Sequence, residues 1–473
     1  MAEYKTPGVY IEEIVKFPPS IASVETAIPA FIGYTESAQN KVPGDLVMIP
    51  TRITSMLDYN RIFGGPQQEE ESITVNIDSS QPQAVIKAVI DPLKASKYLM
   101  AYQLQMFFNN GGGPCYIVST GDYSTGGVIS LTTLTDGLNA VEKIDEVTLL
   151  LFPDAINLTD AASYYTLHKS ALDQCSLLKD RFTVFDIWMD PAIGPAESII
   201  DHNVTLFRDA GFGEIETKKY GAVYFPRVNT QLAYAYDEAT VQVVQTGGDG
   251  SLNGTLAALK GINNAFYYQA LNAITQIRML LPSSAAVVGK YAETDNSRGV
   301  WKAPANIGID YAVSPEVIVT KREQDDLNVD VRDGKSVNVI RFFPGRGPAI
   351  IWGARTLAGN DNEWRYISVR RFFNMVEESV KNATQQFVFE PNDLNTWVRV
   401  KSMIENYLTQ QWKAGALMGT TTREAYFVKV GLGETMTELD VWEGRMIVEI
   451  GMAVVRPAEF IILRFSHKML QES

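Results

Sequence analysis

Apolar and polar residues alternate in two ways along the middle of the chain. Residues 147–155, 181–191 and 220–228 are short and almost continuously apolar, which is typical of strands buried on both faces. Residues 164–178 and 197–211 lie between these runs and repeat apolar positions at helical spacing. Buried strands separated by helices of this length predict parallel β–α–β units, and therefore an α/β region.

Further along the chain, the pattern changes. Residues 246–254 are rich in Gly and Asp and predict a surface loop, followed by one long helix from about Thr255 to Leu281. Residues 337–356 predict two strands around a Pro-Gly-Arg-Gly-Pro loop. Residues 365–387 then predict an amphipathic helix.

A second amphipathic helix is expected over residues 396–414, where apolar residues form one stripe. Asn395 stands where an N-cap residue is expected, and Gly415 stands where a left-handed residue would end the helix.

Both ends of the chain predict strands with apolar residues on both faces. In residues 9–17 one face carries Val9, Ile11, Val15 and Phe17 and is interrupted by Glu13, and Tyr10 and Ile14 add apolar side chains to the other face. Residues 456–469 repeat this pattern. The residues that carry the two patterns are Val9, Tyr10, Ile11, Ile14 and Val15 at the first end, and Phe460, Ile461, Ile462, Leu463 and Phe465 at the second. A bare apolar strand at a chain end invites pairing with another molecule.

Length and charge narrow the class of protein. A chain of 473 residues is long enough for roughly three domains. The net charge is −14, but residues 332–473 contain 18 Lys and Arg against 16 Asp and Glu, so residues 1–331 carry −16. This acidic part argues against nucleic-acid binding, which needs a basic face.

The two cysteines, Cys115 and Cys175, are too few for a disulfide framework and suit a reducing compartment. Neither an apolar leader nor an uninterrupted apolar membrane span is visible in the sequence. We therefore expect a soluble protein made in the cytoplasm, without direct membrane insertion.

Catalytic signatures are weak throughout. His168 and His202 fall within helical patterns, and we interpret them as surface or hydrogen-bonded histidines. Gly111 to Pro114 lacks the residues of a phosphate-binding loop and predicts a turn that ends a helix. Asp154 follows a predicted strand as a single carboxylate, which indicates a turn or cap residue more than an acid catalyst. We predict no catalytic residue, cofactor or metal site, although strand–helix alternation leaves an α/β, hydrolase-like enzyme as an alternative.

Several motifs, in order over most of the chain, resemble the sheath protein of contractile phage tails and phage-tail-like injection systems. The opening TPGVYIEE is similar to the start of that family, and PAEFIILRF is similar to its end. The other matching segments are YNRIFGGP, FFNNGGGPCYIV, VVGKYAETDNSRGVWKAPAN, GARTL, WRYISVRRF, FEPND, TWVRVK and GALMGTTTREAYFV. Residues 66–95 and 229–280 do not match and are interpreted as insertions, which suit outward decorations.

The resemblance implies a multi-domain, mixed α/β and α+β protein. Its middle domain would have a subtilisin-like fold, but the Asp, His and Ser motifs of that protease are absent, so no proteolysis follows. It implies a strand arm and the start of the assembly core in residues 1–30, an outer α/β domain in 31–320, and a C-terminal assembly core with a strand arm in 321–473.

The resemblance also implies a function and partners. Sheath subunits polymerise around an inner tube through donated strands, and contraction drives the tube through a target envelope. The expected partners are other copies of the chain, sheath paralogues, the inner tube protein, the baseplate and a tail terminator or cap, with no nucleic acid. Such a subunit assembles in the cytoplasm into a phage tail or phage-tail-like particle, and extracellular release of the particle stays open.

By analogy of position, Lys401, Lys413 and Arg423 are candidate tube-facing residues. A different self-assembling subunit, of a tail tube or a capsid, is the remaining alternative. The predicted long helices and the α/β middle disfavour a tube subunit, which would be mostly β.

Overall fold

The computed structural model describes residues 20–80, 83–194 and 197–464. The chain divides into two compact units, which we call the small unit (Met1–Val24 and Val376–Val455) and the large unit (Glu25–Met375 and Arg456–Ser473). This division into two units does not test the three segments expected from the sequence. Residues 1–30, 31–320 and 321–473 therefore stay a predicted division.

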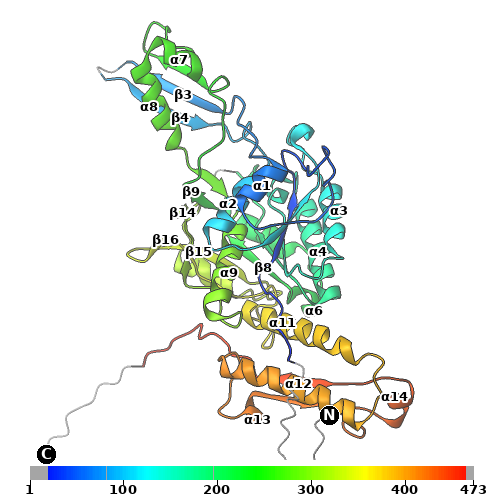
Figure 1. The fold of residues 1–473 in the computed structure, drawn as a ribbon. Coiled ribbons are helices and arrows are strands. Elements are labelled where there is room, and N and C mark those ends of the chain that lie inside the picture. Colours follow the sequence, from blue (N-terminus) through cyan, green and yellow to red (C-terminus); the bar gives the residue numbers. More distant parts are fainter. Residues whose placement is uncertain (1–19, 81–82, 195–196, 465–473) are drawn as a thin grey trace, which may run out of the picture. The chain divides into compact units, whose positions relative to one another are not determined.

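A nine-stranded sheet forms the centre of the large unit (Figure 1). Six neighbouring strands run parallel, β2 and β16 run antiparallel to them at the two sides of this set, and β13 pairs antiparallel with β16 and so runs in the direction of the six. In order across the sheet the strands are β13 (Ile307–Gly308), β16 (Gly347–Ile351), β15 (Val337–Phe343), β8 (Gly221–Phe225), β7 (Phe182–Asp186), β6 (Leu149–Leu151), β1 (Pro29–Gly33), β5 (Cys115–Ser119) and β2 (Thr51–Ile53). The parallel α/β region predicted from the apolar runs is confirmed, as is the strand pair over residues 337–356.

Helices cover both faces of this sheet and create two cores. Along β1, Ala30 and Ile32 belong to one core and Phe31 to the other, because successive side chains of a strand point to opposite faces. One core takes side chains from α3 (Leu131–Val141), α4 (Ala161–Leu178) and α5 (Ile199–Asp209). The other takes them from α1 (Met56–Phe63), α2 (Met100–Asn109) and α9 (Ser284–Arg298). Burial on both faces explains why the strand sequences are continuously apolar.

Each core contains one of the two cysteines. Cys115 lies on β5 in the core beside α2, and Cys175 lies on α4 in the core beside α3. Both are buried free thiols, and burial raises the pKa of each. They therefore act as small apolar side chains.

The two segments interpreted as insertions come together in one small sheet. Its strand order is β11-β10-β3-β4, so strands from residues 66–95 pair with strands from residues 229–280. The elements are β3 (Ile73–Asp78), β4 (Val85–Ile90), β10 (Gln242–Thr246), β11 (Gly254–Thr255), α7 (Leu256–Ile262) and α8 (Asn264–Thr275). Side chains of α7 and α8 share a core with those of β3 and β10.

The long helix predicted over Thr255–Leu281 is wrong in its extent. It is broken at Asn263, whose side chain accepts a hydrogen bond from the backbone N–H of Phe266 and so starts α8 as a new helix. The last part, β12 (Met279–Leu281), is a strand. It pairs in a three-stranded sheet with β9 (Val228–Thr230), and β14 (Ala312–Pro315) lies on the other side of β9.

Three further helices complete the list for the large unit. They are α6 (Ile215–Lys218), α10 (Lys321–Asn328) and the first part of α11 (Ile367–Thr384), which confirms the amphipathic helix predicted there. None of the helices in the described part of the chain is both long and apolar enough to cross a membrane.

The small unit contains helices and a two-stranded sheet. Its elements are the rest of α11, then α12 (Leu394–Lys413), α13 (Thr422–Ala425), β17 (Tyr426–Lys429), α14 (Glu438–Trp442) and β18 (Glu449–Met452). Asp393, and not the predicted Asn395, caps α12, because its carboxylate accepts the N–H of Thr396 at 3.0 Å. Gly415 follows α12 with φ +88°, as predicted for the residue that ends this helix.

Candidate assembly site at the roots of the two chain ends

The described chain begins against the small unit. Ile21 is buried, the hydroxyl of Ser23 lies 3.1 Å from that of Tyr407, and the N–H of Val24 donates to Ser379 Oγ at 3.0 Å. The predicted N-terminal strand residues, Val9, Tyr10, Ile11, Ile14 and Val15, lie outside the described residues. The segment that contains them therefore joins the described part of the chain at residues 20–24.

The next residues are held by the large unit. The hydroxyl of Thr26 donates to Asp295 Oδ2 at 2.7 Å, and its carbonyl accepts from Arg371 at 2.9 Å. Arg371 also pairs with Asp295 through its two terminal guanidinium nitrogens, Nη1 at 3.1 Å and Nη2 at 2.5 Å. The side chains of Arg371 and Asp295 are only 3% and 5% exposed. A buried, bidentate pair of this kind fixes direction as well as position. We call Thr26, Asp295 and Arg371 the N-terminal clamp.

A second carboxylate holds the other end of the chain on the large unit. Glu459 receives two hydrogen bonds from Arg355, Nε at 2.9 Å and Nη2 at 2.6 Å. Asn328 donates to it at 2.8 Å and the hydroxyl of Tyr366 at 3.1 Å. Burial alone would raise the pKa of Glu459, but the bonds from Arg355 and Asn328 bring it below its usual value. We call Glu459, Arg355, Asn328 and Tyr366 the C-terminal clamp.

Four large apolar side chains follow the C-terminal clamp directly and are turned to solvent. Phe460, Ile461, Ile462 and Leu463 are 68%, 80%, 77% and 73% exposed. Residues 456–464 form no strand within the single chain, and the donated strand expected over residues 456–469 stays a prediction. The physical reason is that a strand needs a hydrogen-bonding neighbour, and the described part of this chain supplies none. Phe465 lies outside the described residues.

In the small unit, strands β17 and β18 form a sheet with two open edges. They pair antiparallel from Tyr426 opposite Met452 to Lys429 opposite Glu449, and no third strand joins them among the described residues. The ring of Phe427 lies across Gly451, where a Cβ atom would stand 2.2 Å from the ring. A two-stranded sheet is marginal by itself, and open edges are templates for further strands.

Comparisons with known proteins all point to the same family. A model of the phage tail sheath C-terminal domain matches residues 359–468. The helical sheath of the anti-feeding prophage in its contracted state has a similar chain, with a TM-score of 0.63 and 30% identity over 98% of this chain and 100% of that one. The chain belongs to the contractile sheath family.

Two further relatives agree with this assignment. The contracted PVC sheath complex of an extracellular contractile injection system contains a chain with a TM-score of 0.63 and 28% identity, covering 99% of each chain. The tail sheath protein of Enterobacteria phage T4 is 26% identical over 34% of this chain. That match spans only 24% of the phage protein's length. The resemblance inferred from the motifs is confirmed, and the protein is a structural sheath subunit rather than an enzyme.

In this sheath subunit, the sheet edge where α/β enzymes bind ligands is used for structure. Asp154, beyond the end of β6, accepts hydrogen bonds from the N–H groups of Tyr34 and Leu99 at 2.7 and 2.5 Å. Asp186, at the end of β7, accepts from the backbone and hydroxyl of Ser283 at 2.7 and 2.9 Å. Burial raises the pKa of Asp154 to about 7 and that of Asp186 in the same direction. Asp154, predicted to be a turn or cap residue, does stand directly before the short 3-10 helix Ala155–Asn157, but its carboxylate makes no capping bond there and joins Tyr34 to Leu99 instead.

The histidines give a mixed outcome. His202 bonds to Asp190 at 2.9 Å and to Glu197 at 3.1 Å, as predicted for a hydrogen-bonded histidine. His168 is neither on the surface nor hydrogen-bonded: both ring nitrogens are buried without a partner among the described residues. Its ring stacks on Phe185 at 4.2 Å, and burial lowers its pKa to about 3. The helical spacing located His168 correctly, but spacing cannot tell a neutral, stacked imidazole from an exposed one.

The candidate tube-facing residues all lie in the small unit. Lys401 and Lys413 are on α12, and Arg423 is on α13. Lys413 and Arg423 are exposed and Lys401 is half-buried, and none of the three forms an ion pair within the described residues. Their role stays a prediction.

The clamp residues are site residues that sequence reasoning missed. A signal exists for two of them, Glu459 and Arg371, because each lies next to apolar residues. Glu459 directly precedes four apolar residues, and Arg371 lies in an apolar helical stripe. A charged residue in such a place is expected to be paired when it is buried. The partner's identity, however, depends on the tertiary fold.

Proposed function

We propose that copies of this chain polymerise around an inner tube by exchanging terminal strands, and that contraction of the polymer drives the tube through a target envelope. The observation that carries this proposal is the run of exposed apolar residues, Phe460–Leu463, fixed at its root by Glu459. Exposing four consecutive large apolar side chains to water is unfavourable, so a covering partner is expected.

Strand addition to a second copy fits both halves of this interface. The open edges of β17 and β18 offer unpaired backbone groups, and residues 460–465 and 9–17 carry apolar side chains on both faces, as an inserted strand should. Backbone hydrogen bonds would supply affinity, and the alternating side chains would set the register.

The arrangement in the particle follows by analogy with the family. Residues 31–320, with a subtilisin-like fold, would form the outer layer and carry the combined insertions as a decoration. Residues 321–473 would face the tube, with Lys401, Lys413 and Arg423 as contacts. The inner tube, the baseplate, a terminator or cap and sheath paralogues are the proposed partners of a particle assembled in the cytoplasm.

Contraction on this scheme needs no bound nucleotide. If the contracted lattice buries about 1,000 Å² more apolar surface per subunit, it gains roughly 25 kcal/mol before ordering costs are subtracted. Energy stored in the extended lattice would then be released by many subunits in series.

The test is electron microscopy of the full-length chain, produced with its tube protein, beside a chain that ends at Glu459 and so keeps the C-terminal clamp. We expect tubular polymers from the first and folded, unassembled protein from the second. The circular dichroism spectrum of the shortened chain is the control for folding. Polymers formed equally by both chains would refute the C-terminal strand exchange.

A further inference from the structure

The two clamps meet on one helix. Tyr366, which donates to Glu459, is the residue directly before α11. Arg371, which holds Thr26 and Asp295, lies in the second turn of the same helix. Arg355 is tied to this place as well, because it forms an isolated antiparallel bridge with Tyr366. The roots of the two chain ends, far apart in sequence, are therefore attached five residues apart.

We propose that the first part of α11, Tyr366–Met375, mechanically couples the N-terminal and C-terminal arms of each subunit. A pull on one arm is passed through its clamp to this segment, and from there to the other arm. The inference rests on the proposed exchange of strands, because only arms held by neighbours carry tension.

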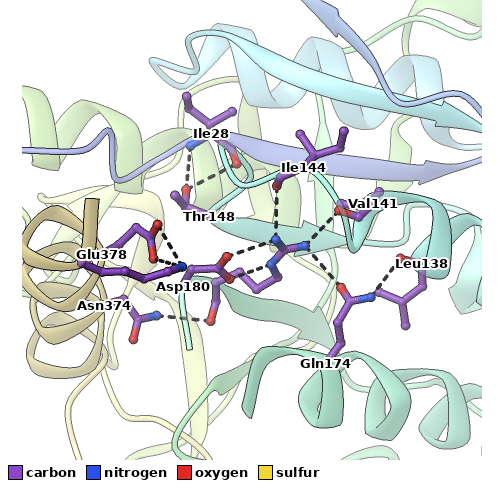
Figure 2. A network of polar contacts seen from close by, with 11 residues as sticks. Ile28, Leu138, Val141, Ile144, Thr148, Gln174, Asp180, Asn374 and Glu378 are labelled. Carbon is purple, nitrogen blue, oxygen red and sulfur yellow. Dashed lines mark hydrogen bonds and ion pairs between the residues drawn. The ribbon is translucent and has the colours of Figure 1, made fainter. Parts of the chain in front are cut away.

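The segment is anchored well enough to act as one rigid piece. Arg370 is fully buried, and its guanidinium lies over the rings of Tyr220, Trp364 and Phe373 at 5.0, 4.4 and 5.5 Å. Figure 2 shows Asn374 of α11, whose amide donates to the backbone carbonyl of Arg181, at the start of β7, at 3.2 Å. Close-packed, hydrogen-bonded side chains of this kind transmit displacement instead of absorbing it.

The N-terminal root is tied to the same sheet. The N–H of Ile28 donates to the hydroxyl of Thr148 at 2.9 Å, a contact also visible in Figure 2. The same hydroxyl donates to the carbonyl of Thr26 at 3.0 Å. Residues 26–28 then enter β1, a parallel strand between β6 and β5. The clamp therefore leaves little slack between the N-terminal arm and the large unit.

The number of residues between the clamp and the apolar segment differs between the two arms. Glu459 directly precedes Phe460, whereas eight residues separate Phe17 from Thr26. A shift of Glu459 would therefore move the exchanged C-terminal strand at once. The N-terminal arm is joined to its clamp through residues 18–25, of which Ser23 and Val24 also bond to Tyr407 and Ser379 of the small unit, so this unit shares the displacement of the arm.

The experiment compares clamp variants in the complete particle, with the rate of triggered contraction, followed by electron microscopy, as the readout. Glu459→Gln weakens the C-terminal clamp and Asp295→Asn the N-terminal one. Loss of a charge-assisted hydrogen bond shifts an equilibrium by roughly tenfold, so we expect each variant to contract about ten times more slowly. Because the clamps act in series, the double variant should be no slower than the slower single variant.

Glu316→Gln is the matched control. Glu316 also receives a bidentate pair from an arginine, Arg227, at 2.9 and 2.6 Å, and its side chain is 23% exposed against 21% for Glu459. It touches neither arm, so its contraction rate should stay within about twofold of the parent while its thermal stability falls as much as that of Glu459→Gln. Equal slowing by both glutamate variants would reduce the C-terminal clamp to a structural role and overturn the coupling.

Milder variants keep the test valid if Asp295→Asn does not fold. Thr26→Val and Tyr366→Phe each remove one neutral hydroxyl and leave both ion pairs in place. Slowing that multiplies in their double variant would show two independent arms and overturn the coupling. If the parent chain forms no tubular polymer at all, the proposed function itself fails, which is a different result from polymers that contract with independent arms.

Discussion

The nine-stranded sheet of the large unit is covered by helices on both faces, and its parallel strands lie between two hydrophobic cores. Strands β17 and β18 of the small unit form a sheet of two, with open edges among the described residues. The first sheet buries its backbone groups within one chain. The second can do so only with strands from elsewhere, so a substitution should affect folding in the first and assembly in the second.

The largest effect is expected at the network around Arg181 beside the large sheet. This fully buried guanidinium pairs with Asp180 and donates to the carbonyls of Val141 and Ile144, among the contacts in Figure 2. Arg181→Met leaves a buried carboxylate unpaired and should lower the free energy of unfolding by about 3–5 kcal/mol. Urea denaturation of the unassembled chain measures this loss.

Arg52→Met is the matched control, since the pair of Arg52 with Glu146 is about 40% exposed on both sides. Its loss should lower the free energy of unfolding by less than about 1 kcal/mol. Equal losses at both arginines would contradict the importance given to the buried network.

The next effect separates folding from assembly at the small sheet. Because Ala453 donates to Ala425, the alternation of the ladder turns the N–H of Ile450 away from β17, toward the open edge of β18. Ile450→Pro removes that donor, so tubular polymers should be lost while the chain still folds. Sedimentation and circular dichroism measure the two properties. Ile450→Val, which keeps the N–H, should assemble like the parent, and polymers from the proline variant would argue against strand addition at this edge.

A smaller effect should depend on pH in the large unit. Burial lowers the pKa of His168 to about 3, against an ordinary value of about 6.5, so its neutral form stabilises the fold. This contribution is complete above pH 6.5 and is lost as the pH falls toward 3. The opposite shift of Asp154, to about 7, makes stability fall as the pH rises from about 4 to 7, and this masks the histidine in the parent chain.

The stability difference between His168→Phe and the parent isolates the histidine. It should be constant above pH 6.5 and should grow in favour of the variant as the pH decreases from 6.5 to about 3. Urea denaturation at several pH values measures it. A difference that does not change with pH would show that His168 is solvated in the folded protein.

The smallest effect concerns the orientation of the two units in the particle. Reversing the charge of Lys401, Lys413 or Arg423 should reduce assembly around the tube more than reversing Glu70 or Glu71. Glu69 is unsuitable as a control because it is buried and accepts a hydrogen bond from Ser72 at 2.6 Å. Quantitative microscopy of tube-filled sheaths measures the effect. Equal reductions in both sets would contradict a tube-facing small unit.

Much of the large unit could be predicted from sequence because its pattern is local. Strands β6, β7 and β8 are apolar throughout because both of their faces are buried, and α4 and α5 carry an apolar stripe because one side of each helix is buried. The union of the two insertions could not be predicted, since pairing between β3 and β10 depends on contacts far apart in sequence. The break at Asn263 was missed because apolar spacing continues across it, and only the cap distinguishes two helices from one.

The site was predicted in part. The C-terminal pattern correctly indicated an apolar segment, exposed at Phe460–Leu463, but the strand expected there needs a neighbour that an isolated chain does not supply. The clamps depend on Asp295 and Arg371, or Arg355 and Glu459, meeting in three dimensions, and no spacing rule reports such meetings.

The two buried cysteines have a practical consequence for optical measurements. Cys115 and Cys175 are the only thiols in the sequence, and each is closed inside a core with a raised pKa, so neither should react with maleimide dyes while the chain is folded. A cysteine introduced at exposed Ala458 would therefore take up dye alone. The natural chain should therefore give little background labelling in fluorescence resonance energy transfer between neighbouring copies, without prior replacement of its own cysteines.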